Sequence, residues 1–376
     1  MDKSLGLYIH IPFCAAKCAY CDFYSLPRSE EKMDLYAAAL CGDLRRFAPQ
    51  AADHTVDTVY FGGGTPSYLG AQRLIAVLDT VKSCFRLDSS AEITLEANPD
   101  SAGDAGSLSR LRAAGFNRIS LGVQSSDDEM LKRIGRIHTW AQVPQTVTAI
   151  RAAGFDNLSV DLIYGLPGQT MAQWQKTLAD AVALSPEHIS AYVLKLEPGT
   201  PLWRQRDVLT FPDDDQQAEM YLWAVTFLQQ NGYFQYEISN FSRPGKASRH
   251  NLKYWRLEEY AGFGPGAHSD FGGVRYAIAR DLDGYIAGTA ALSERTEITP
   301  AERAREYVML SVRTAEGVSP SVLEARYGGS FAPLEPLLRT YEAHGLAEPG
   351  GLGWRLTPGG FLVSNAIIGA LLETME

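Results

Sequence analysis

Short apolar segments and longer amphipathic segments alternate six times along the first two thirds of this chain. The short segments are rich in β-branched and aromatic residues, as buried parallel strands are, and they span residues 7–13, 58–62, 93–98, 118–124, 158–164 and 188–196. Each is followed along the chain by a segment with the apolar periodicity of a helix. Six strand–helix units in succession predict an α/β fold, and specifically a partial (β/α)6 barrel. An open doubly wound sheet is the alternative that this order leaves open.

The sequence RAAGF occurs twice in this region, at residues 112–116 and 151–155, and a predicted strand follows each copy. In both copies the glycine is suited to end a helix before a tight turn. The repetition therefore supports a series of similar strand–helix units.

The pattern predicts three parts. Residues 1–239 form the barrel, residues 240–300 form a glycine- and aromatic-rich connecting segment without regular structure, and residues 301–376 form a small C-terminal domain. In the last part, short helices precede a glycine-punctuated hairpin and a final helix, which is the order of a winged-helix-like α+β domain. This part has six Arg against nine Glu and no Lys or Asp, and its net charge of −3 disfavours a DNA-reading role.

The composition of the 376 residues, with 45% hydrophobic and 21% charged side chains, excludes a mainly disordered chain. No apolar stretch approaches the roughly 20 residues that a membrane-spanning helix needs. The excess of 44 Asp and Glu over 34 Lys and Arg gives a net charge of −10, which is unfavourable for binding nucleic acid. The N-terminus has no signal or transit pattern, so we expect a cytoplasmic protein.

Three of the five cysteines, Cys14, Cys18 and Cys21, lie in the loop after the first predicted strand. In a barrel, the loops at the carboxyl ends of the strands carry the active site. Three thiolates at this spacing can each bind one iron of a [4Fe–4S] cluster and leave the fourth iron open to a small molecule. A zinc site completed by His10 or Asp22 is the alternative that the spacing leaves open.

Polar and flexible residues follow other predicted strands as well. Residues 62–64 are three glycines followed by Thr65, and the missing side chains let a ligand approach the backbone. Glu96, Gln124 and Asp161 lie at or near the ends of three later strands. Because the carboxyl ends of the strands of one barrel surround one opening, we expect these side chains to line one cavity.

Taken together, these motifs resemble the radical S-adenosylmethionine (SAM) superfamily. The resemblance is carried by Tyr-x-His-Ile-Pro-Phe at 8–13, by the Cys-x3-Cys-x-Tyr-Cys loop and by GGGTP at 62–66. Within the superfamily the chain is similar to the oxygen-independent coproporphyrinogen III oxidase-like group. The sequences HNLKYW at 250–255 and GFGPGAHS at 262–269 point to the haem chaperone branch of that group. The resemblance covers nearly the whole chain and implies a barrel of the radical SAM type.

The resemblance also implies a map of the site. Cys14, Cys18 and Cys21 would hold the [4Fe–4S] cluster, with SAM on the fourth iron. The residues implied for SAM binding are Tyr8, Tyr20, Gly63, Gly64, Thr65, Glu96, Gln124, Arg136 and Asp161. These residues suit SAM, which carries an ammonium and a sulfonium beside a carboxylate, because they offer acidic groups and a guanidinium. No residue is assigned a catalytic role.

Two departures bear on the function. The oxidases that this chain resembles have a fourth Cys two residues after the third, where this chain has Phe23, and a long N-terminal extension, where it has 13 residues before Cys14. Both departures disfavour coproporphyrinogen oxidation and leave the cluster and the SAM site intact, so an enzymatic activity stays undecided. The resemblance instead implies a haem chaperone, which binds haem and transfers it to acceptor proteins. A radical SAM oxidoreductase acting on a porphyrin is the alternative.

His250, Tyr254 and Trp255 are the residues that we expect to bind haem, with His268 as a second candidate ligand. Histidine is a common axial ligand of haem, and aromatic rings offer a surface for a flat macrocycle. Taken alone, such residues more often pack a segment against the barrel, and the resemblance favours the haem role. The other expected partners are haem acceptors such as respiratory enzymes and an electron donor for the cluster. A homodimer that depends on the cluster is compatible with the sequence.

Overall fold

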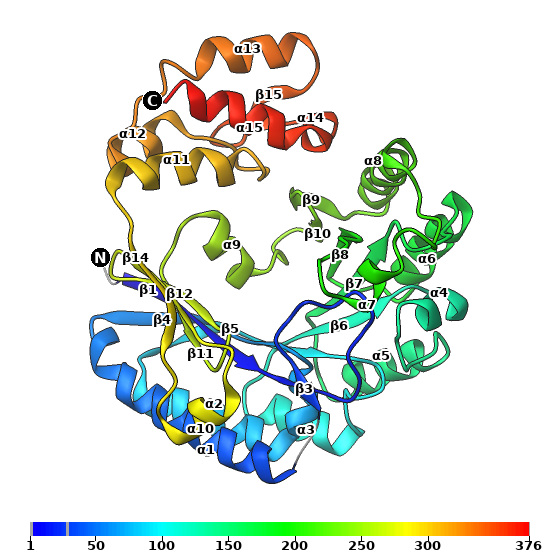
Figure 1. Ribbon diagram of the computed structural model, residues 1–376, viewed down its shortest axis with the longest axis vertical. Helices are drawn as coiled ribbons and strands as arrows, with labels where there is room; N and C mark the ends of the chain where they lie inside the picture. The colour runs from blue at the N-terminus through cyan, green and yellow to red at the C-terminus, as the bar shows by residue number, and fades with distance from the viewer. Residues whose placement is uncertain (1–2, 28–29, 376) are drawn as a thin grey trace.

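The computed structural model describes residues 3–27 and 30–375, and its central feature is one mixed sheet of twelve strands, which is curved (Figure 1). The six predicted strands form the parallel middle of this sheet in chain order. They are β1 (Lys3–Ile11), β4 (His54–Gly63), β5 (Leu87–Ala97), β6 (Arg118–Gln124), β7 (Leu158–Tyr164) and β8 (His188–Val193). β6 and β7 have the predicted bounds, β1, β4 and β5 begin earlier than predicted, and β8 ends earlier.

The sheet is open. Its strand order runs from β14 (Leu292–Glu297) at one edge to β9 (Phe234–Glu237) at the other, and no pairing among the described residues joins these edges. Because the long helices lie on one face of a curved parallel sheet, the fold is the predicted partial barrel and not a doubly wound sheet (Figure 1).

The long helices cover the convex face of the barrel strands (Figure 1). They are α1 (Glu30–Phe47), α2 (Ala71–Cys84), α3 (Ala105–Ala113), α5 (Gln142–Ala152), α6 (Met171–Ala183) and α8 (Asp214–Gln230). α6 and α8 both begin with a capping box, in which the Thr170 or Asp213 side chain accepts a backbone N–H three residues later. The outward side chains of the strands, such as Val59, Leu121 and Val160, are fully buried and form the core with these helices.

The inward side chains of the same strands are mostly polar. On β6, for example, Ile119, Leu121 and Val123 are buried among apolar residues, while Arg118, Ser120 and Gln124 line a cavity. The interior of a closed barrel is usually filled by layers of Val, Ile and Leu. Here the period-two alternation keeps the interior from packing as a hydrophobic core.

The prediction that residues 240–300 lack regular structure is wrong. This segment adds strands to both edges of the barrel sheet and two helices beside it. The elements are β10 (Asn240–Ser242), α9 (Arg249–Trp255), β11 (Tyr260–Phe263), β12 (His268–Phe271), β13 (Val274–Ile278), α10 (Leu282–Ala287) and β14. β10 pairs with β8 and with β9, whereas β11 lies parallel to β1 and continues the barrel by a seventh parallel strand.

The strands of this segment are only three to six residues long, and their glycines interrupt the apolar alternation that would have indicated them. One signal was present. Gly272 and Gly273 have φ values of 62° and 78° and join β12 to β13, as glycines do in a tight hairpin turn.

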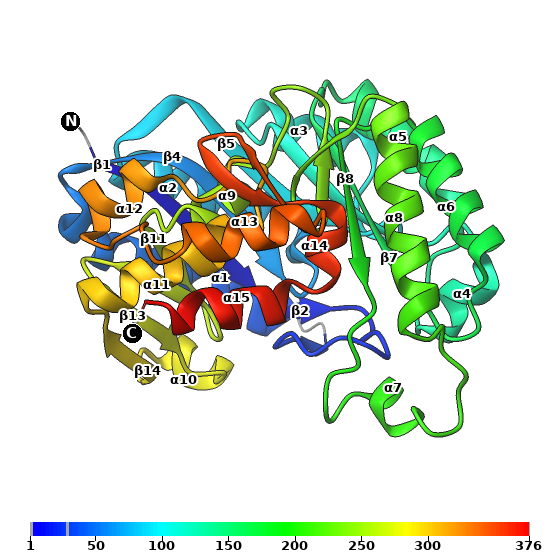
Figure 2. The ribbon, with the colours of Figure 1, turned by 90° about the horizontal axis from the view of Figure 1, so that it is seen from above.

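The C-terminal part lies on the concave side of the sheet, beside α9 (Figures 1 and 2). It has the predicted order of helices, hairpin and final helices. Its elements are α11 (Pro300–Ser311), α12 (Pro320–Tyr327), α13 (Glu335–Ala343), β15 (Ala347–Gly350), β16 (Gly353–Leu356), α14 (Pro358–Leu362) and α15 (Ser364–Glu373). Within the described ranges, no helix combines the length and the apolar composition that spanning a bilayer requires.

Short elements at the carboxyl ends of the strands complete the fold. They are β2 (Phe13–Cys14), β3 (Leu26–Pro27), a 3-10 turn at Pro66–Leu69, α4 (Asp128–Arg133) and α7 (Pro201–Arg204), with a further 3-10 turn at Ala48–Ala51 after α1. α7 projects beyond the end of β8 on the side where the cysteine loop lies (Figure 2). The Leu202 N–H of α7 donates to the carbonyl of Ala19 in that loop at 2.9 Å.

The packing of the convex face predicts a large cost for removing Phe61 of β4. Its ring is fully buried against Phe116, with ring centroids 5.0 Å apart, so Phe61→Ala should lower the free energy of unfolding by about 3–5 kcal/mol. Phe234→Ala, at a half-exposed position of β9, is the matched control and should cost less than about 1 kcal/mol. Urea denaturation followed by circular dichroism measures both losses, and equal losses would contradict the core position of Phe61.

Candidate functional site

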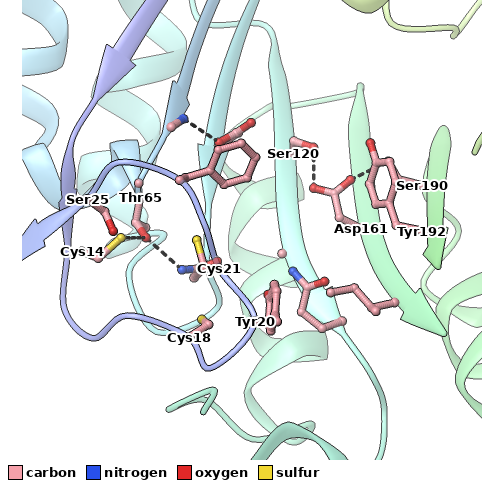
Figure 3. A pocket seen from close by; sticks show the side chains of 18 of the residues that line it. Cys14, Cys18, Tyr20, Cys21, Ser25, Thr65, Ser120, Asp161, Ser190 and Tyr192 are labelled. Atoms are coloured by element: carbon pink, nitrogen blue, oxygen red, sulfur yellow. Dashed lines mark hydrogen bonds between the residues drawn. The ribbon is translucent and has the colours of Figure 1, made fainter. Parts of the chain in front are cut away.

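A cavity of about 570 Å³ lies at the carboxyl ends of the barrel strands and continues between them into the barrel (Figure 3). The structure brings most of the predicted cluster and SAM residues together around it. Its lining includes Cys14, Cys18, Tyr20, Cys21, Gly63, Gly64, Thr65, Glu96, Gln124, Arg136 and Asp161. Tyr8, His250, Tyr254 and Trp255 are not among the lining residues.

The three cysteines of the loop between β1 and α1 are free thiols that are partly exposed to the cavity. Burial raises the pKa of the Cys14 and Cys21 thiols. Cys18 lies beside the guanidinium of Arg136, whose Nη1 donates to its Sγ at 3.5 Å. A thiolate needs a positive or metal neighbour in such surroundings, and Arg136 provides one next to Cys18.

Within residues 3–27 and 30–375, no three His, Cys, Asp or Glu side chains are gathered as the ligands of one ion would be. His10, the first candidate for a fourth zinc ligand, is buried, and its ring nitrogens are 3.1 Å from the Tyr8 hydroxyl and 3.1 Å from the Tyr24 carbonyl. Burial also lowers the pKa of His10 to about 4. A cubane requires a wider arrangement, because each thiolate binds a different iron.

The glycines after β4 hold the cysteine loop by backbone contacts. Gly64 N–H donates to the Ile11 carbonyl at 2.9 Å, and Thr65 N–H donates to the Phe13 carbonyl at 2.8 Å. A Cβ atom at Gly64 would lie 2.8 Å from the Phe13 oxygen, so any side chain here would push the loop away. The glycine therefore fixes the start of the cysteine loop against the end of β4.

A chain of hydrogen bonds connects the thiols to two further strands. Thr65 Oγ1 lies 3.4 Å from Cys14 Sγ and accepts from Asn98 Nδ2 at 3.1 Å (Figure 3). Arg136 Nη2 donates to Asn98 Oδ1 at 2.6 Å, and its Nη1 reaches Cys18. Asn98, which sequence analysis missed, lies two residues after Glu96 and therefore follows the same face of β5.

The end of β6 is shaped to admit the Arg136 guanidinium. Its Nη2 also donates to the Gly122 carbonyl at 2.5 Å, and a Cβ atom at Gly122 would lie 3.1 Å from that nitrogen and 2.7 Å from Asn98 Oδ1. Gln124 follows with a φ of 67°, a left-handed conformation that is uncommon for a residue other than glycine. Strained conformations of this kind are concentrated at binding sites, and Gln124 lines the cavity.

Glu96 lies at the cavity wall and is already held by two donors. The Tyr60 hydroxyl donates to Oε1 at 2.7 Å, and the Gly63 N–H donates to Oε2 at 3.2 Å. Burial raises the pKa of Glu96 to about 7, with the negative charge of Asp161 adding to the effect and the two hydrogen bonds opposing it. Near neutral pH this carboxyl group therefore exchanges between its neutral and charged forms.

Asp161 on β7 accepts hydrogen bonds from three serine hydroxyls. Ser120 donates to Oδ2 at 2.9 Å, and Ser190 and Ser159 donate to Oδ1 at 2.6 and 3.4 Å (Figure 3). The three serines come from β6, β8 and β7, so Asp161 joins neighbouring strands inside the barrel. Charge-assisted bonds of this kind hold a carboxylate in one orientation.

Tyr20 and Tyr8 have different positions. Tyr20 lines the cavity within the cysteine loop, and burial raises its pKa. Tyr8 is on the inward face of β1, and its ring lies 5.9 Å from that of His10, 6.3 Å from that of Tyr60 and 6.4 Å from that of His250. Tyr8 is therefore enclosed by other rings and is not part of the cavity lining.

His250, expected to bind haem, is enclosed within the barrel. Its side chain is 1% exposed, Nδ1 lies 2.9 Å from Thr58 Oγ1, and Nε2 lies 2.8 Å from the Tyr254 hydroxyl. Burial lowers the pKa of His250 to about 3. In this conformation neither ring nitrogen is available to an iron. His268 is exposed on β12 and is not part of the cavity lining.

The sequence contained a signal for the site residues that were missed inside the strands. In 118–124 the residues alternate strictly between apolar side chains and Arg, Ser, Gly and Gln. Such alternation places every second residue on one face, so Arg118 and Ser120 could have been assigned to the same face as Gln124.

Comparisons with known proteins identify the family of the chain. The family model described as Radical SAM superfamily matches residues 8–181, and that described as HemN C-terminal domain matches residues 298–363. A relative from Bacillus subtilis named "Heme chaperone HemW" is 36% identical over 97% of this chain and 98% of its own length. A relative of the same name from Escherichia coli is 35% identical over 97% of both chains.

The solved structure of coproporphyrinogen III oxidase (HemN) from Escherichia coli superposes with a TM-score of 0.84 at 26% identity, over 98% of this chain and 90% of that chain. That protein is described as a radical SAM enzyme. Radical SAM membership implies that a [4Fe–4S] cluster and SAM are bound, and three free thiols facing the cavity fit that requirement. The chain belongs to the HemW family of the radical SAM superfamily.

Proposed function

We propose that this protein is a haem chaperone, which binds haem and transfers it to acceptor proteins, and that it carries a [4Fe–4S] cluster with exchangeable SAM. The observation that carries the proposal is the similarity to relatives named heme chaperone HemW over nearly the full length of both chains. We propose respiratory enzymes as the haem acceptors. We also propose that a separate protein donates electrons to the cluster and that the chain forms a homodimer that depends on the cluster.

The cluster would be held by Cys14, Cys18 and Cys21, and when bound it supplies one-electron chemistry to SAM. The chain's own residues orient SAM. Arg136 and Asn98 offer donors at the cluster end, Gln124 an amide, and Glu96 a carboxylate that can receive an ammonium group. The methionine part of SAM would lie along Gly63, Gly64 and Thr65, which line the cavity beside the cysteine loop.

Exposed apolar side chains at the rim of the cavity support a haem surface. Phe23 is 65% exposed, and Tyr192 and Val193 at the end of β8 are exposed on the same cavity. Soluble proteins that expose such a group of side chains around a cavity commonly use it to bind an apolar partner. A flat macrocycle covered by these residues would remove them from water.

We propose that His250 contacts haem only in a conformation that differs from the one described above. Its Nε2 becomes available to iron only after the hydrogen bond to Tyr254 breaks, which requires a movement of α9 or of the Tyr254 side chain. Tyr254 and Trp255 on the same helix would then contact the macrocycle.

A radical SAM oxidoreductase acting on a porphyrin is the second candidate. The observation that favours it is the close superposition on HemN, which is named a coproporphyrinogen III oxidase. Phe23 stands where the oxidases that the sequence resembles carry a further cysteine, and this speaks against the candidate. An anaerobic assay with coproporphyrinogen III, SAM and a reductant separates the two, because formation of protoporphyrinogen IX would reject the chaperone as the sole function.

Removing one thiol tests the cluster. Cys14→Ala should reduce the iron and sulfide content of the anaerobically reconstituted protein from about four atoms of each per chain to well below one. Cys84→Ala, which removes a free thiol outside the cavity, is the matched control and should leave both contents unchanged. Equal contents in the wild type and in Cys14→Ala would remove Cys14 from the cluster site.

The raised pKa of Glu96 predicts a pH dependence of SAM binding. The carboxylate form is needed to receive an ammonium group, so the affinity for SAM should rise with pH up to about 7 and then level off. Glu96→Gln should abolish this rise and weaken binding by about 1.5–3 kcal/mol, the range for a hydrogen bond to a charged group. Equilibrium dialysis of labelled SAM between pH 6 and 8.5, roughly one unit or more on each side of that pKa, measures both effects. An identical pH profile in the variant would contradict the role of Glu96.

Two variants of α9 test the haem contact. His250→Ala should weaken haem binding about tenfold or more if Nε2 ligates iron after release from Tyr254. Tyr254→Phe removes the competing hydrogen bond and should preserve or strengthen haem binding while keeping an aromatic surface. Absorption titration with haem gives both affinities. Unchanged binding in His250→Ala, or equal weakening in both variants, would assign His250 to the packing of α9 alone.

A further inference from the structure

The floor of the barrel contains a buried cation, Arg118, that has no hydrogen-bonded partner among the described residues. Arg118 is the first residue of β6, its side chain is 1% exposed, and it lines the inner end of the cavity. No hydrogen bond or ion pair joins its guanidinium to any other residue of the described ranges, and its Nε is buried without a partner. Arginine keeps its charge at any pH that the protein meets.

Another fully buried cation of the same chain shows the contrast. Lys253 on α9 is also 1% exposed, but its Nζ lies 2.8 Å from Asp57 Oδ1 and 3.1 Å from Glu258 Oε2. Lys253, a buried cation with a structural role, is thus neutralised by two carboxylates, as expected from the free-energy cost of burying a charge. Arg118 has no such pair and faces a cavity instead.

The carboxylates and the imidazole around Arg118 are hydrogen-bonded to other residues, whereas the hydroxyl of Thr94, opposite Arg118 on β5, has no partner. Asp161 accepts from its three serines, and Glu92 accepts the N–H groups of Arg249 and His250 at 3.2 and 3.1 Å. The ring nitrogens of His188 lie 2.7 Å from Ser159 Oγ and 2.8 Å from the Tyr236 hydroxyl. The guanidinium is therefore the charged group at the floor whose donors remain for a ligand.

The charges nearby limit what that ligand is. Glu92 and Asp161 are the carboxylates that act on Arg118 through space, and they repel an anion of two or more charges more strongly than a monoanion. A guanidinium presents parallel N–H donors that match the two oxygens of a carboxylate. The site suits a planar monoanion better than a phosphate.

We propose that Arg118 binds the carboxylate of a small aliphatic acid that occupies the inner half of the cavity, as a second ligand beside SAM. Arg118 begins β6 and Gln124 ends it, so the guanidinium lies deeper in the barrel than the cluster end of the cavity. A SAM molecule with its carboxylate at the cluster end would therefore leave Arg118 to another carboxylate.

The test uses the full-length, cluster-loaded protein and saturation-transfer NMR with propionate as the probe. Wild-type protein should transfer saturation to propionate but not to propionamide, which has nearly the same shape and no charge. Arg118→Met should reduce the propionate signal by about tenfold or more, the size expected for losing a charge-assisted pair. Arg280→Gln removes an exposed arginine at the mouth of the same cavity and should leave the signal unchanged.

A thermal melt of the same variants separates binding from folding. Arg118→Met removes the positive charge beside Glu92 and Asp161 and should lower Tm moderately, so the melt shows whether each variant is still folded when its propionate signal is compared. Arg118→Lys keeps the charge without the paired donors and should show an intermediate propionate signal, which gives a second folded variant.

Competition identifies the source of the carboxylate. Displacement of propionate by haem but not by haem dimethyl ester would support the site and assign it to a tetrapyrrole propionate. Displacement by neither would support a separate small acid, and this result stands even where haem itself does not bind and the chaperone function fails. No propionate signal in the wild type, or an equal signal in Arg118→Met, would overturn the proposal.

Discussion

The strict alternation of apolar and polar residues along the barrel strands is the constraint on which the site depends. Outward residues such as Val59 and Val160 bury apolar surface against the helices and supply the stability of the fold. Inward residues cannot pack as a hydrophobic core, so the cavity keeps its shape by hydrogen bonds. Asp161 joins three strands through serines, and His250 joins Thr58 to Tyr254. Most of these polar groups are held by hydrogen bonds to one another, and the interior remains open because they are not large apolar side chains.

The cysteine loop has little regular structure of its own, so its geometry comes from elsewhere. Backbone bonds from Gly64 and Thr65 fix its start, and the Ala19 N–H donates to the Ile134 carbonyl at 2.9 Å near its tip. The chain of contacts from Cys14 through Thr65 and Asn98 to Arg136 and Cys18 then connects the loop to three strand ends. A change at any of these strand ends would move the thiols relative to one another, which a cubane bound at three corners does not tolerate.

Local sequence patterns predicted the strands in which apolar and polar residues alternate clearly. They missed the strands that form only because a distant part of the chain pairs with them. β6 and β7 have strong alternation and clear bounds, and the structure confirms both. β11 has only four residues and becomes a strand because it lies beside β1, which is about 250 residues earlier in the chain. The same reason applies to the site. Positions after strands identified Glu96 and Asp161 for the cavity, but the enclosure of His250 depends on how α9 packs against the barrel, which no local pattern contains.

The electrostatics of the interior differ from those of the surface. The chain has a net charge of −10, which repels anions at long range. Inside the barrel, burial keeps His250 neutral and raises the pKa of Glu96 to about 7, so the interior carries less negative charge than its composition indicates. Arg118 cannot respond to burial in this way, because arginine does not lose its proton. The sign of the potential at the barrel floor is therefore set by one guanidinium and the hydrogen-bonded carboxylates around it. The negative surface repels an approaching anion, so Arg118 can attract an anion only over a short distance, once that anion is inside the cavity.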